Sequence, residues 1–206
     1  MEVYLQNLSK SFEGKWVFRD LSYSFNTGGF YAITGPNGSG KSTLLKIIAG
    51  YLTPTKGSID FYEANNSIPS ESLFRYLSLA APFCEFPEEL TFPELITFYQ
   101  NFKALSPGVS QSRLIDLFSY QKKISLPLSQ YSSGMLQRTK ILLALASDTP
   151  LIILDEPTSF LDLQGKEWFK ELLGTFRTPE KLIVMATNME EERQLAEKEC
   201  FLKGGV

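Results

Sequence analysis

The chain has 206 residues, of which 43% are hydrophobic and 21% are charged, a composition typical of a globular protein with a sizeable core. The net charge of −3 and the lack of any run rich in Lys and Arg argue against a nucleic-acid-binding surface, which is normally basic. The chain contains no histidine, which excludes histidine-based catalysis, and no run of about 18 apolar residues, which excludes a membrane-spanning helix.

The first 34 residues predict an antiparallel β-region. Apolar and polar residues alternate along it, and turn residues interrupt the alternation at 13–14 and 27–29. Phe12 and Val17 lie on this region, where they would cover a flat ring such as adenine. Packing in the core is the simpler interpretation of a single phenylalanine, and the residues alone leave both interpretations open.

Residues 35–42, GPNGSGKS, match the phosphate-binding pattern G-x-x-x-x-G-K-[ST]. An apolar strand at 30–33 precedes them and an apolar-periodic helix at 43–49 follows, which is the context that the motif requires. The glycines lack Cβ atoms, so the backbone can aim its N–H groups at phosphate oxygens, and the helix start adds the positive end of its dipole. Lys41 is placed to reach the β- and γ-phosphates and Ser42 to bind Mg²⁺. The sequence therefore predicts that a nucleoside triphosphate binds here.

Residues 83–130 differ in character from their flanks. Aromatic residues and prolines cluster at the start of this stretch, and helical patterns follow at 94–105 and 111–118. We therefore expect one domain over 1–206, whose core comprises 1–82 and 131–206, with a helical subdomain at about 83–130.

The core segments before that subdomain predict two short strands, at 58–62 and 73–80, separated by a polar loop. After it, Ser132 and Gly134 stand at the start of an apolar helix that includes 141–146. That placement suits either an ordinary N-cap or an anion site, and the ordinary cap is the simpler interpretation.

The apolar run 151–154 predicts a buried parallel strand that ends in Asp155 and Glu156. Ligands bind at the carboxyl ends of strands in open α/β sheets, so Asp155 is placed to reach the Mg²⁺ shell and Glu156 to contact an attacking water. Asp162 follows as an N-cap of a helix at about 163–173. Further strands are expected at 182–186, just before Asn188, and at 200–202.

On these motifs the chain resembles an ATP-binding cassette (ABC) ATPase, the nucleotide-binding subunit of ABC transporters. GPNGSGKST is similar to the family's Walker A motif and LIILDEP to its Walker B motif. YSSGM stands where the signature LSGGQ belongs, and SFLD where the D-loop belongs. The resemblance covers essentially the whole chain. It implies an α/β fold, a P-loop NTPase core with a mixed sheet flanked by helices, an N-terminal antiparallel β-region and an inserted α-helical subdomain.

The resemblance also implies how the site works: two cassettes dimerise head to tail, with ATP sandwiched between the Walker A motif of one and the signature of the other. Phe12 then stacks on adenine and Val17 lies near the ribose. The phosphate cradle is Gly35, Pro36, Asn37, Gly38, Ser39, Gly40, Lys41, Ser42 and Thr43. The implied metal ligands are Ser42 and Asp155, and the catalytic residues are Glu156 (the general base), Lys41 and Asn188. The signature residues offered in trans are Ser132, Ser133 and Gly134, and Asp162 is the D-loop aspartate.

Several positions depart from the family pattern. Ser133 replaces the first glycine of the signature and Met135 replaces its glutamine. The Q-loop glutamine, which touches Mg²⁺ and the lytic water, is expected near Pro82, where no side chain supplies a carbonyl. Asn188 replaces the switch histidine; it donates a hydrogen bond but carries no positive charge. We therefore expect weak, partner-dependent ATP hydrolysis.

The leading hypothesis for function is an ATPase subunit that energises a membrane transporter. The partners would be ATP, a second cassette in a homodimer or heterodimer, and separate transmembrane permease subunits, with no nucleic acid. Two widely spaced cysteines and no secretory-signal pattern favour a cytoplasmic location, peripheral on the inner face of the cell membrane. Compact cassettes of this length resemble exporter subunits. A soluble, non-transport ABC ATPase and a regulatory ATP-binding module with very low hydrolysis are the alternatives.

Overall fold

The computed structural model describes residues 1–204, and the chain folds into two compact units. Within the described residues, the first unit is made of Met1–Leu77, Pro150–Glu156 and 178–204, and the second of Ser78–Thr149 and Pro157–Arg177. The expected helical subdomain, 83–130, lies within the second unit, which also takes in two longer helices. The division of the chain into functional domains stays a prediction.

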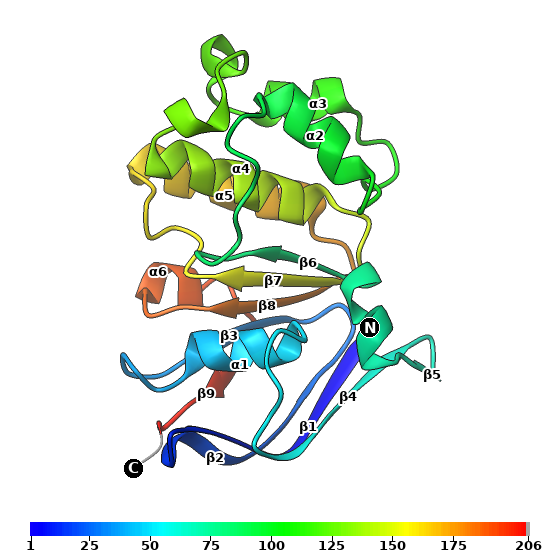
Figure 1. Cartoon of the computed structure of the whole chain (residues 1–206), viewed down its shortest axis with the longest axis vertical. Helices are drawn as coiled ribbons and strands as arrows, with labels where there is room; N and C mark the ends of the chain where they lie inside the picture. The colour runs from blue at the N-terminus through cyan, green and yellow to red at the C-terminus, as the bar shows by residue number, and fades with distance from the viewer. Residues whose placement is uncertain (205–206) are drawn as a thin grey trace. The chain divides into compact units, whose positions relative to one another are not determined.

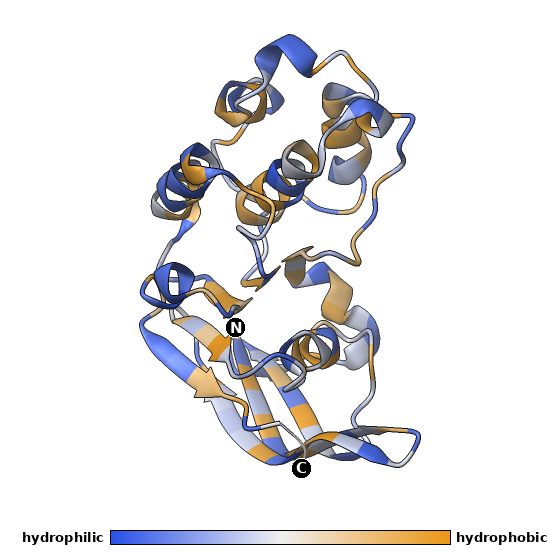
Figure 2. Cartoon of the chain, turned by 90° about the vertical axis from the view of Figure 1, so that its left-hand side faces the viewer, coloured by the Kyte–Doolittle hydropathy of each residue, from blue (hydrophilic) through white to orange (hydrophobic). Residues whose placement is uncertain are grey.

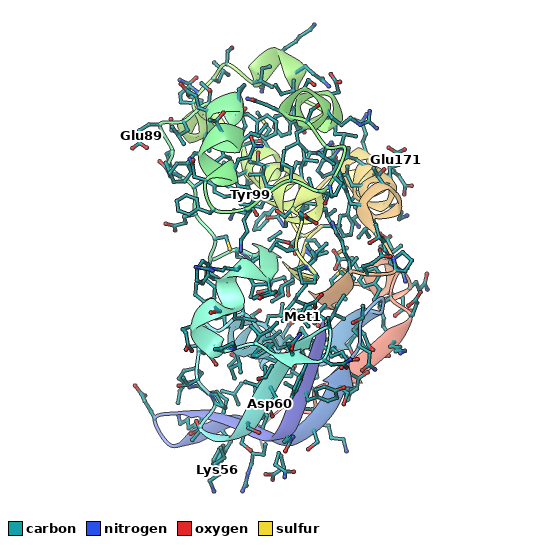
Figure 3. The ribbon with its side chains drawn as sticks, turned by 90° about the vertical axis from the view of Figure 1, so that its right-hand side faces the viewer. Met1, Lys56, Asp60, Glu89, Tyr99 and Glu171 are labelled. Carbon is teal, nitrogen blue, oxygen red and sulfur yellow. The ribbon has the colours of Figure 1, made fainter. Side chains whose placement is uncertain are left out.

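An antiparallel sheet in the first unit confirms the β-region expected near the N-terminus (Figure 1). Its strands, in spatial order, are β2 (Lys15–Phe25), β1 (Glu2–Phe12), β4 (Lys56–Glu63) and β5 (Asn66–Ser67). Side chains alternate between a buried and a solvated face, which Figure 2 shows as alternating hydrophobic and hydrophilic bands along the strands. Val3 and Leu5 are buried, whereas Asp60, labelled in Figure 3, projects from β4.

The first unit also contains a parallel sheet, which forms its core. Those of its strands that lie wholly in the first unit are, in spatial order, β7 (Leu151–Asp155), β8 (Leu182–Ala186), β3 (Phe30–Thr34) and β9 (Lys198–Phe201). Every residue of β3, β7 and β8 is buried, as expected for a parallel sheet that is covered on both faces. Because the strands are parallel, the segments that follow β3, β7 and β8 emerge at one edge of the sheet, where ligands bind in such folds.

Two helices complete the first unit. They are α1 (Lys41–Ile48), which packs against β7 and β8, and the short α6 (Glu190–Arg193). α1 buries Leu44, Leu45 and Ile47 against the sheet, so the helix start is held in place directly after the glycine-rich loop.

The strand expected at 73–80 is partly wrong. Ser70–Arg75 forms a 3₁₀-helix, η1, and only Leu77–Ala80, β6, is a strand, along which the chain passes from the first unit to the second. In η1, Leu73 is buried while its neighbours Phe74 and Arg75 are exposed. A short run of apolar residues does not distinguish a helical turn from a strand, because both bury such residues.

The second unit is helical. It contains α2 (Phe92–Gln100), α3 (Gln111–Leu117), α4 (Ser133–Ala146) and α5 (Leu163–Phe176), with two 3₁₀ turns, η2 (Gln121–Lys123) and η3 (Leu128–Gln130). α4 packs against α5 and α3, and α2 packs against α3, as the run of helices in Figure 1 shows. Tyr99 on α2, labelled in Figure 3, is hydrogen-bonded through its hydroxyl to Ser147 Oγ at 2.9 Å.

α2 is shorter than the expected helix at 94–105. It starts two residues earlier because Thr91 and Glu94 form a capping box. It ends at Gln100, where Asn101 Nδ2 donates to the carbonyl oxygens of Thr97 and Phe98. These side-chain hydrogen bonds satisfy carbonyl groups that have no backbone partner at a helix end. In residues 1–204, no helix has the length and apolar character that crossing a membrane requires.

Candidate functional site

The loop between β3 and α1 is shaped so that only glycine fits at two of its positions. Gly35 has a φ of +142°, and a Cβ there would overlap the carbonyl oxygen of Leu202 and lie 2.8 Å from Ser39 Oγ. Gly40 has a φ of +97°, and its Cβ would lie 2.5 Å from Val17 Cγ1. Val17 thus contacts this loop, as a residue near a bound nucleotide would. The expected glycine-rich loop, with a strand before it and a helix after it, is confirmed.

The polar groups of this loop fit a phosphate group. Ser39 Oγ is buried and has no hydrogen-bond partner within the described residues. Lys41 is only 7% exposed, and its Nζ donates to the carbonyl oxygens of Gly35 (3.0 Å) and Pro36 (3.2 Å). Within residues 1–204, Lys41 forms no ion pair, so a buried ammonium charge is left for an anion. α1 has no side-chain N-cap, so the N–H groups of its first turn are not used by a cap either.

Asp155, the last residue of β7, lies directly beside the start of α1. The Ser42 hydroxyl donates to Asp155 Oδ1 at 3.0 Å, and Asp155 is 2% exposed. Burial raises the pKa of Asp155 and the nearby Glu156 charge adds to this, while the Ser42 hydrogen bond and the Lys46 and Lys41 charges oppose it.

This pair of oxygens fits Mg²⁺. Magnesium takes oxygen ligands at about 2.0–2.1 Å in octahedral geometry, which places neighbouring ligands about 3 Å apart. The separation of Ser42 Oγ and Asp155 Oδ1 has that value. A cation there would also neutralise a carboxylate that burial destabilises.

Glu156 follows Asp155 at the carboxyl end of β7 in an unusual backbone conformation. Its φ is +46°, in the left-handed region that side-chain-bearing residues rarely adopt. Its N–H donates to the Ala186 carbonyl oxygen at 2.9 Å, which ties the residue to the end of β8. Backbone strain of this kind persists where the surrounding structure imposes it, and it is concentrated at functional sites.

Asn188, just beyond β8, is brought against the glycine-rich loop. Its Nδ2 donates to Asn37 Oδ1 of the loop. The preceding Thr187 is buried and its hydroxyl is hydrogen-bonded to the Glu192 carboxylate, while Met189 N–H donates to Thr187 Oγ1 at 2.9 Å. Sequence reasoning placed Asn188 in the site but missed its contact with Asn37, because no local pattern pairs residues 151 positions apart.

Phe12 ends β1 and is 47% exposed. Lys10 Nζ lies 4.8 Å from the centre of the Phe12 ring, a cation–π distance. An exposed aromatic ring with a cation beside it is not packed in the core, so the simpler interpretation of Phe12 is wrong. The stacking of adenine on this ring stays a prediction.

The second unit contains the remaining residues. Ser132 is the N-cap of α4, and its Oγ accepts from Met135 N–H at 3.3 Å. Ser133 is the exposed first residue of the helix, and a Cβ on Gly134 would lie 3.0 Å from the carbonyl oxygen of Phe160. Asp162 caps α5, with its Oδ1 accepting from Gly165 N–H at 2.7 Å. These residues lie in a different unit from the glycine-rich loop.

The segment around Pro82 has no glutamine, and a lysine contacts it instead. Lys140 of α4 directs its Nζ at the carbonyl oxygens of Ala81 (3.3 Å) and Pro82 (3.4 Å). Burial lowers the pKa of Lys140, and the nearby Cys84 and Glu85 oppose this. Sequence reasoning missed Lys140 because it is one of several polar residues on a long helix, with no motif to mark it.

Comparison with known proteins gives one family. The family model described as ABC transporter matches residues 18–159. The chain is 33% identical over 192 residues to the cytochrome c biogenesis ATP-binding export protein CcmA of Brucella abortus (strain 2308), covering 92% of this chain and 86% of that protein. It is 31% identical over 210 residues to the lantibiotic transport ATP-binding protein SrtF of Streptococcus pyogenes, covering 98% and 86%.

The same family is found among solved structures. A dimeric structure of a bacterial ABC transporter cassette superimposes with a TM-score of 0.80 at 25% identity, covering 98% of this chain and 94% of that one. The antiparallel sheet, the parallel sheet around the glycine-rich loop and the helical unit are thus the parts of a known fold. The chain belongs to the ABC transporter family and has the fold of its ATP-binding cassettes.

Proposed function

We propose that this chain is the ATP-binding and ATP-hydrolysing subunit of an ABC transporter, and that it works as half of an ATP-sandwich dimer. The observation that carries the proposal is the hydrogen bond between Ser42 and Asp155, which joins the phosphate loop to the end of β7. Hydroxyl and carboxylate oxygens at that spacing are the pair that a magnesium nucleotide needs. In this proposal residues 1–82 and 131–206 act as the ATPase core and about 83–130 as the helical subdomain.

The loop between β3 and α1 binds the triphosphate. The Lys41 ammonium exchanges the carbonyl oxygens of Gly35 and Pro36 for the β- and γ-phosphates, which are stronger acceptors because they are charged. Ser39 Oγ, buried and without a partner in the described chain, gains one. Gly38, Gly40 and Thr43 contribute N–H groups to the same cradle. Val17 supports the loop, and Phe12 presents its ring to adenine.

Ser42 and Asp155 would hold Mg²⁺. When bound, the ion would supply charge neutralisation for the phosphoryl group. Binding in turn relieves the cost of burying the Asp155 carboxylate, whose pKa is raised by that burial. The fit of this pair therefore supports ATP in its magnesium form.

Glu156 is the general base. It stands at the carboxyl end of β7, one residue beyond Asp155, and accepts a proton from the attacking water. Asn188 holds the opposite side of the loop through Asn37 and turns its amide to the γ-phosphate when ATP is present. An amide donates a hydrogen bond without a positive charge, so it stabilises the developing negative charge less than an imidazolium would.

The second unit supplies the other half of a site. Ser132, Ser133 and Gly134 at the start of α4, with Asp162 at the start of α5, face the ATP that is bound by a second cassette. The exposed backbone N–H groups at the start of a helix are suited to bind a γ-phosphate. The relative solved as a dimer is a precedent for two cassettes together.

Hydrolysis is slow and depends on the partner. Two groups that usually position the phosphate and the water are changed, with Pro82 at the glutamine position and Asn188 at the histidine position. Each such group is typically worth about 10²–10³ in rate. Lys140, which contacts the carbonyl oxygens beside Pro82, offers no acceptor for a metal ion.

The transporter context rests on the relatives. CcmA and SrtF carry export and transport in their names, and we extend that context to this chain. It would sit at the inner face of the cell membrane, attached to separate permease subunits. The favoured alternative is a regulatory ATP-binding module, and the observation behind it is the pair of changes at Pro82 and Asn188.

The test is ATP binding and hydrolysis by the purified chain, alone and with the membrane protein that co-purifies with it. We expect the chain to bind ATP. Lys41→Ala should weaken this binding by at least about tenfold, because it removes the charge nearest the phosphates. The exposed control Lys122→Ala should leave ATP binding unchanged. We expect slow hydrolysis that the membrane partner stimulates. Tight ATP binding with no hydrolysis in either setting would favour the regulatory module, and no ATP binding would contradict both.

A further inference from the structure

Arg138 on α4 is buried in the second unit and is not among the residues that bind or hydrolyse ATP in the proposed function. It is 2% exposed, and its guanidinium carbon lies 5.2 Å from the centre of the Tyr120 ring and 5.0 Å from that of Trp168. Two aromatic faces at these distances stabilise a desolvated cation and hold its plane in one orientation. Trp168 is itself fixed, because its Nε1–H donates to the Leu117 carbonyl oxygen at 2.8 Å.

The hydrogen bonds of Arg138 connect three segments. Its Nη1 donates to Ser119 Oγ at 2.7 Å, and its Nη2 donates to Asp162 Oδ1 at 3.3 Å. The same Asp162 oxygen caps α5 by accepting from Gly165 N–H. One carboxylate, 70% exposed, is therefore tied both to its own helix and to α4.

Glycine at position 165 leaves room at the start of α5 for the contact between Arg138 and Asp162. A Cβ at Gly165 would lie 3.0 Å from Arg138 Nη2, 3.0 Å from Asp162 Oδ1 and 2.9 Å from Leu161 Cβ. Glycine is unfavourable within a helix because of its freedom in the unfolded chain. In the first turn of α5 it leaves the space through which the guanidinium reaches Asp162.

The aromatic rings beside Arg138 are packed, one against the next, as far as Tyr131, the residue just before Ser132. Tyr120 meets Phe118 edge-on, with ring centres 5.7 Å apart, and Phe118 stacks with Tyr131 at 5.9 Å. The Tyr131 hydroxyl donates to the Lys123 carbonyl oxygen at 3.2 Å. Arg138 thus contacts Asp162 directly and is connected to the start of α4 through packed rings.

We propose that Arg138 is a positioning residue for the half-site that one cassette presents to the ATP of its partner, because it fixes Asp162 and the start of α4 in a single arrangement. This inference rests on the proposed function, since it needs ATP to be sandwiched between two copies. Arg138 is buried, so it acts through Asp162 and Tyr131 and does not touch nucleotide. Lysine does not replace it, because an ammonium lacks the planar fork that bonds two partners while lying between two rings.

The test uses the full chain with Glu156→Gln, which blocks hydrolysis and so accumulates any ATP-bound dimer. Arg138→Lys and Arg138→Met are added to it, with Arg113→Met on the exposed part of α3 as the matched control for loss of charge. Sedimentation with ATP and Mg²⁺ measures dimerisation, and a fluorescent ATP analogue at low protein concentration measures nucleotide affinity of the monomer. Thermal unfolding without nucleotide reports on folding.

We expect both Arg138 variants to weaken ATP-dependent dimerisation by about tenfold, with monomer affinity for ATP and the control unchanged. Equal dimerisation in all variants would overturn the inference, and so would a parallel loss of monomer ATP affinity, which would show a merely structural role. If Arg138→Met does not fold, Arg138→Lys and Gly165→Ala, which pushes the guanidinium away from Asp162, decide the matter by the same criterion. Absence of a dimer with Glu156→Gln alone would instead contradict the proposed function.

Discussion

The Ser42 hydroxyl donates a 3.0 Å hydrogen bond to Asp155 Oδ1 and so joins two residues that are 113 positions apart in the chain. The contact links the start of α1 to the end of β7. Burial raises the pKa of Asp155, and this hydrogen bond is the strongest influence that opposes the shift. The buried Asp155 carboxylate therefore lowers the stability of the fold, and a bound cation would offset that cost.

Asp155→Asn should therefore raise the stability of the nucleotide-free protein at pH 7. The pKa of Asp155 is higher in the folded protein than in the unfolded chain. Its favourable contribution to folding stability is therefore present at low pH and is lost as the pH rises through the pKa of the folded state. Asparagine keeps an oxygen for Ser42 and carries no charge. We expect a gain on the order of 1 kcal/mol, or roughly 2–4 °C in Tm.

Melting curves at pH 7 and pH 4, with and without ATP and Mg²⁺, check this prediction. The difference between Asp155→Asn and the parent should shrink at pH 4, where the Asp155 carboxyl of the parent takes up a proton. The Mg²⁺-dependent part of the protection by ATP should be reduced in the variant. A lower Tm for the variant without nucleotide at pH 7, or full Mg²⁺-dependent protection, contradicts the account.

Gly35→Ala should disrupt the phosphate loop far more than Gly38→Ala. Both glycines have positive φ, but a Cβ at Gly35 meets Leu202 O and Ser39 Oγ, whereas nothing lies within 4 Å of a Cβ at Gly38. Gly38→Ala then costs only backbone strain, about 1–2 kcal/mol. Gly35→Ala adds a steric clash, and we expect ATP affinity to fall by more than about tenfold because the loop shifts. Comparable losses of stability and affinity in the two variants, measured by unfolding and ATP titration, argue against this.

Glu156→Gly should stabilise the fold while abolishing hydrolysis. Glu156 has a φ of +46°, which costs a side-chain-bearing residue about 1–2 kcal/mol and glycine very little. The greater freedom of glycine in the unfolded chain offsets part of that gain, so a net rise of about 0.5–1 kcal/mol is expected. Glu156→Gln keeps the strain and should stay near the parent in stability. Urea unfolding without nucleotide measures both, and a Glu156→Gly protein less stable than Glu156→Gln would refute the strain argument.

Asn188→His should increase ATP turnover. The Asn188 amide contacts Asn37 in the loop, and an imidazole there gains the ability to carry a positive charge toward the γ-phosphate. We expect kcat to rise by about 10- to 100-fold with little change in KM, because the gain is made in the transition state. Asn188→Ala serves as the opposite control and should lower kcat. An unchanged or reduced kcat in Asn188→His would mean that Asn188 does not limit hydrolysis.

The sequence predicts the parts of this molecule that local patterns encode. The glycine-rich loop, the buried strand before Asp155 and the caps at Ser132 and Asp162 depend on residue type and spacing, and each lies where expected. The strand predicted at 73–80 is confirmed only over its second half, because Leu73 is buried equally well in a 3₁₀ turn and in a strand.

The remaining features depend on tertiary structure. The Asn188 contact with Asn37 and the contacts of Arg138 with Asp162 and two aromatic rings join segments that no period or motif relates. The left-handed conformation of Glu156 likewise has no sequence signal, since a glutamate seldom adopts it. Each of these was visible only once the strands and helices were in place.

The central claim is that one chain holds half of an ATP site, and its most direct test is the mass of the Glu156→Gln protein in sedimentation with ATP. We expect a monomer without nucleotide and a dimer with ATP and Mg²⁺. We also expect that Ser132→Arg, which blocks the start of α4, restores the monomer while ATP still binds. A protein that binds ATP tightly and stays monomeric at saturating ATP and Mg²⁺ would contradict it.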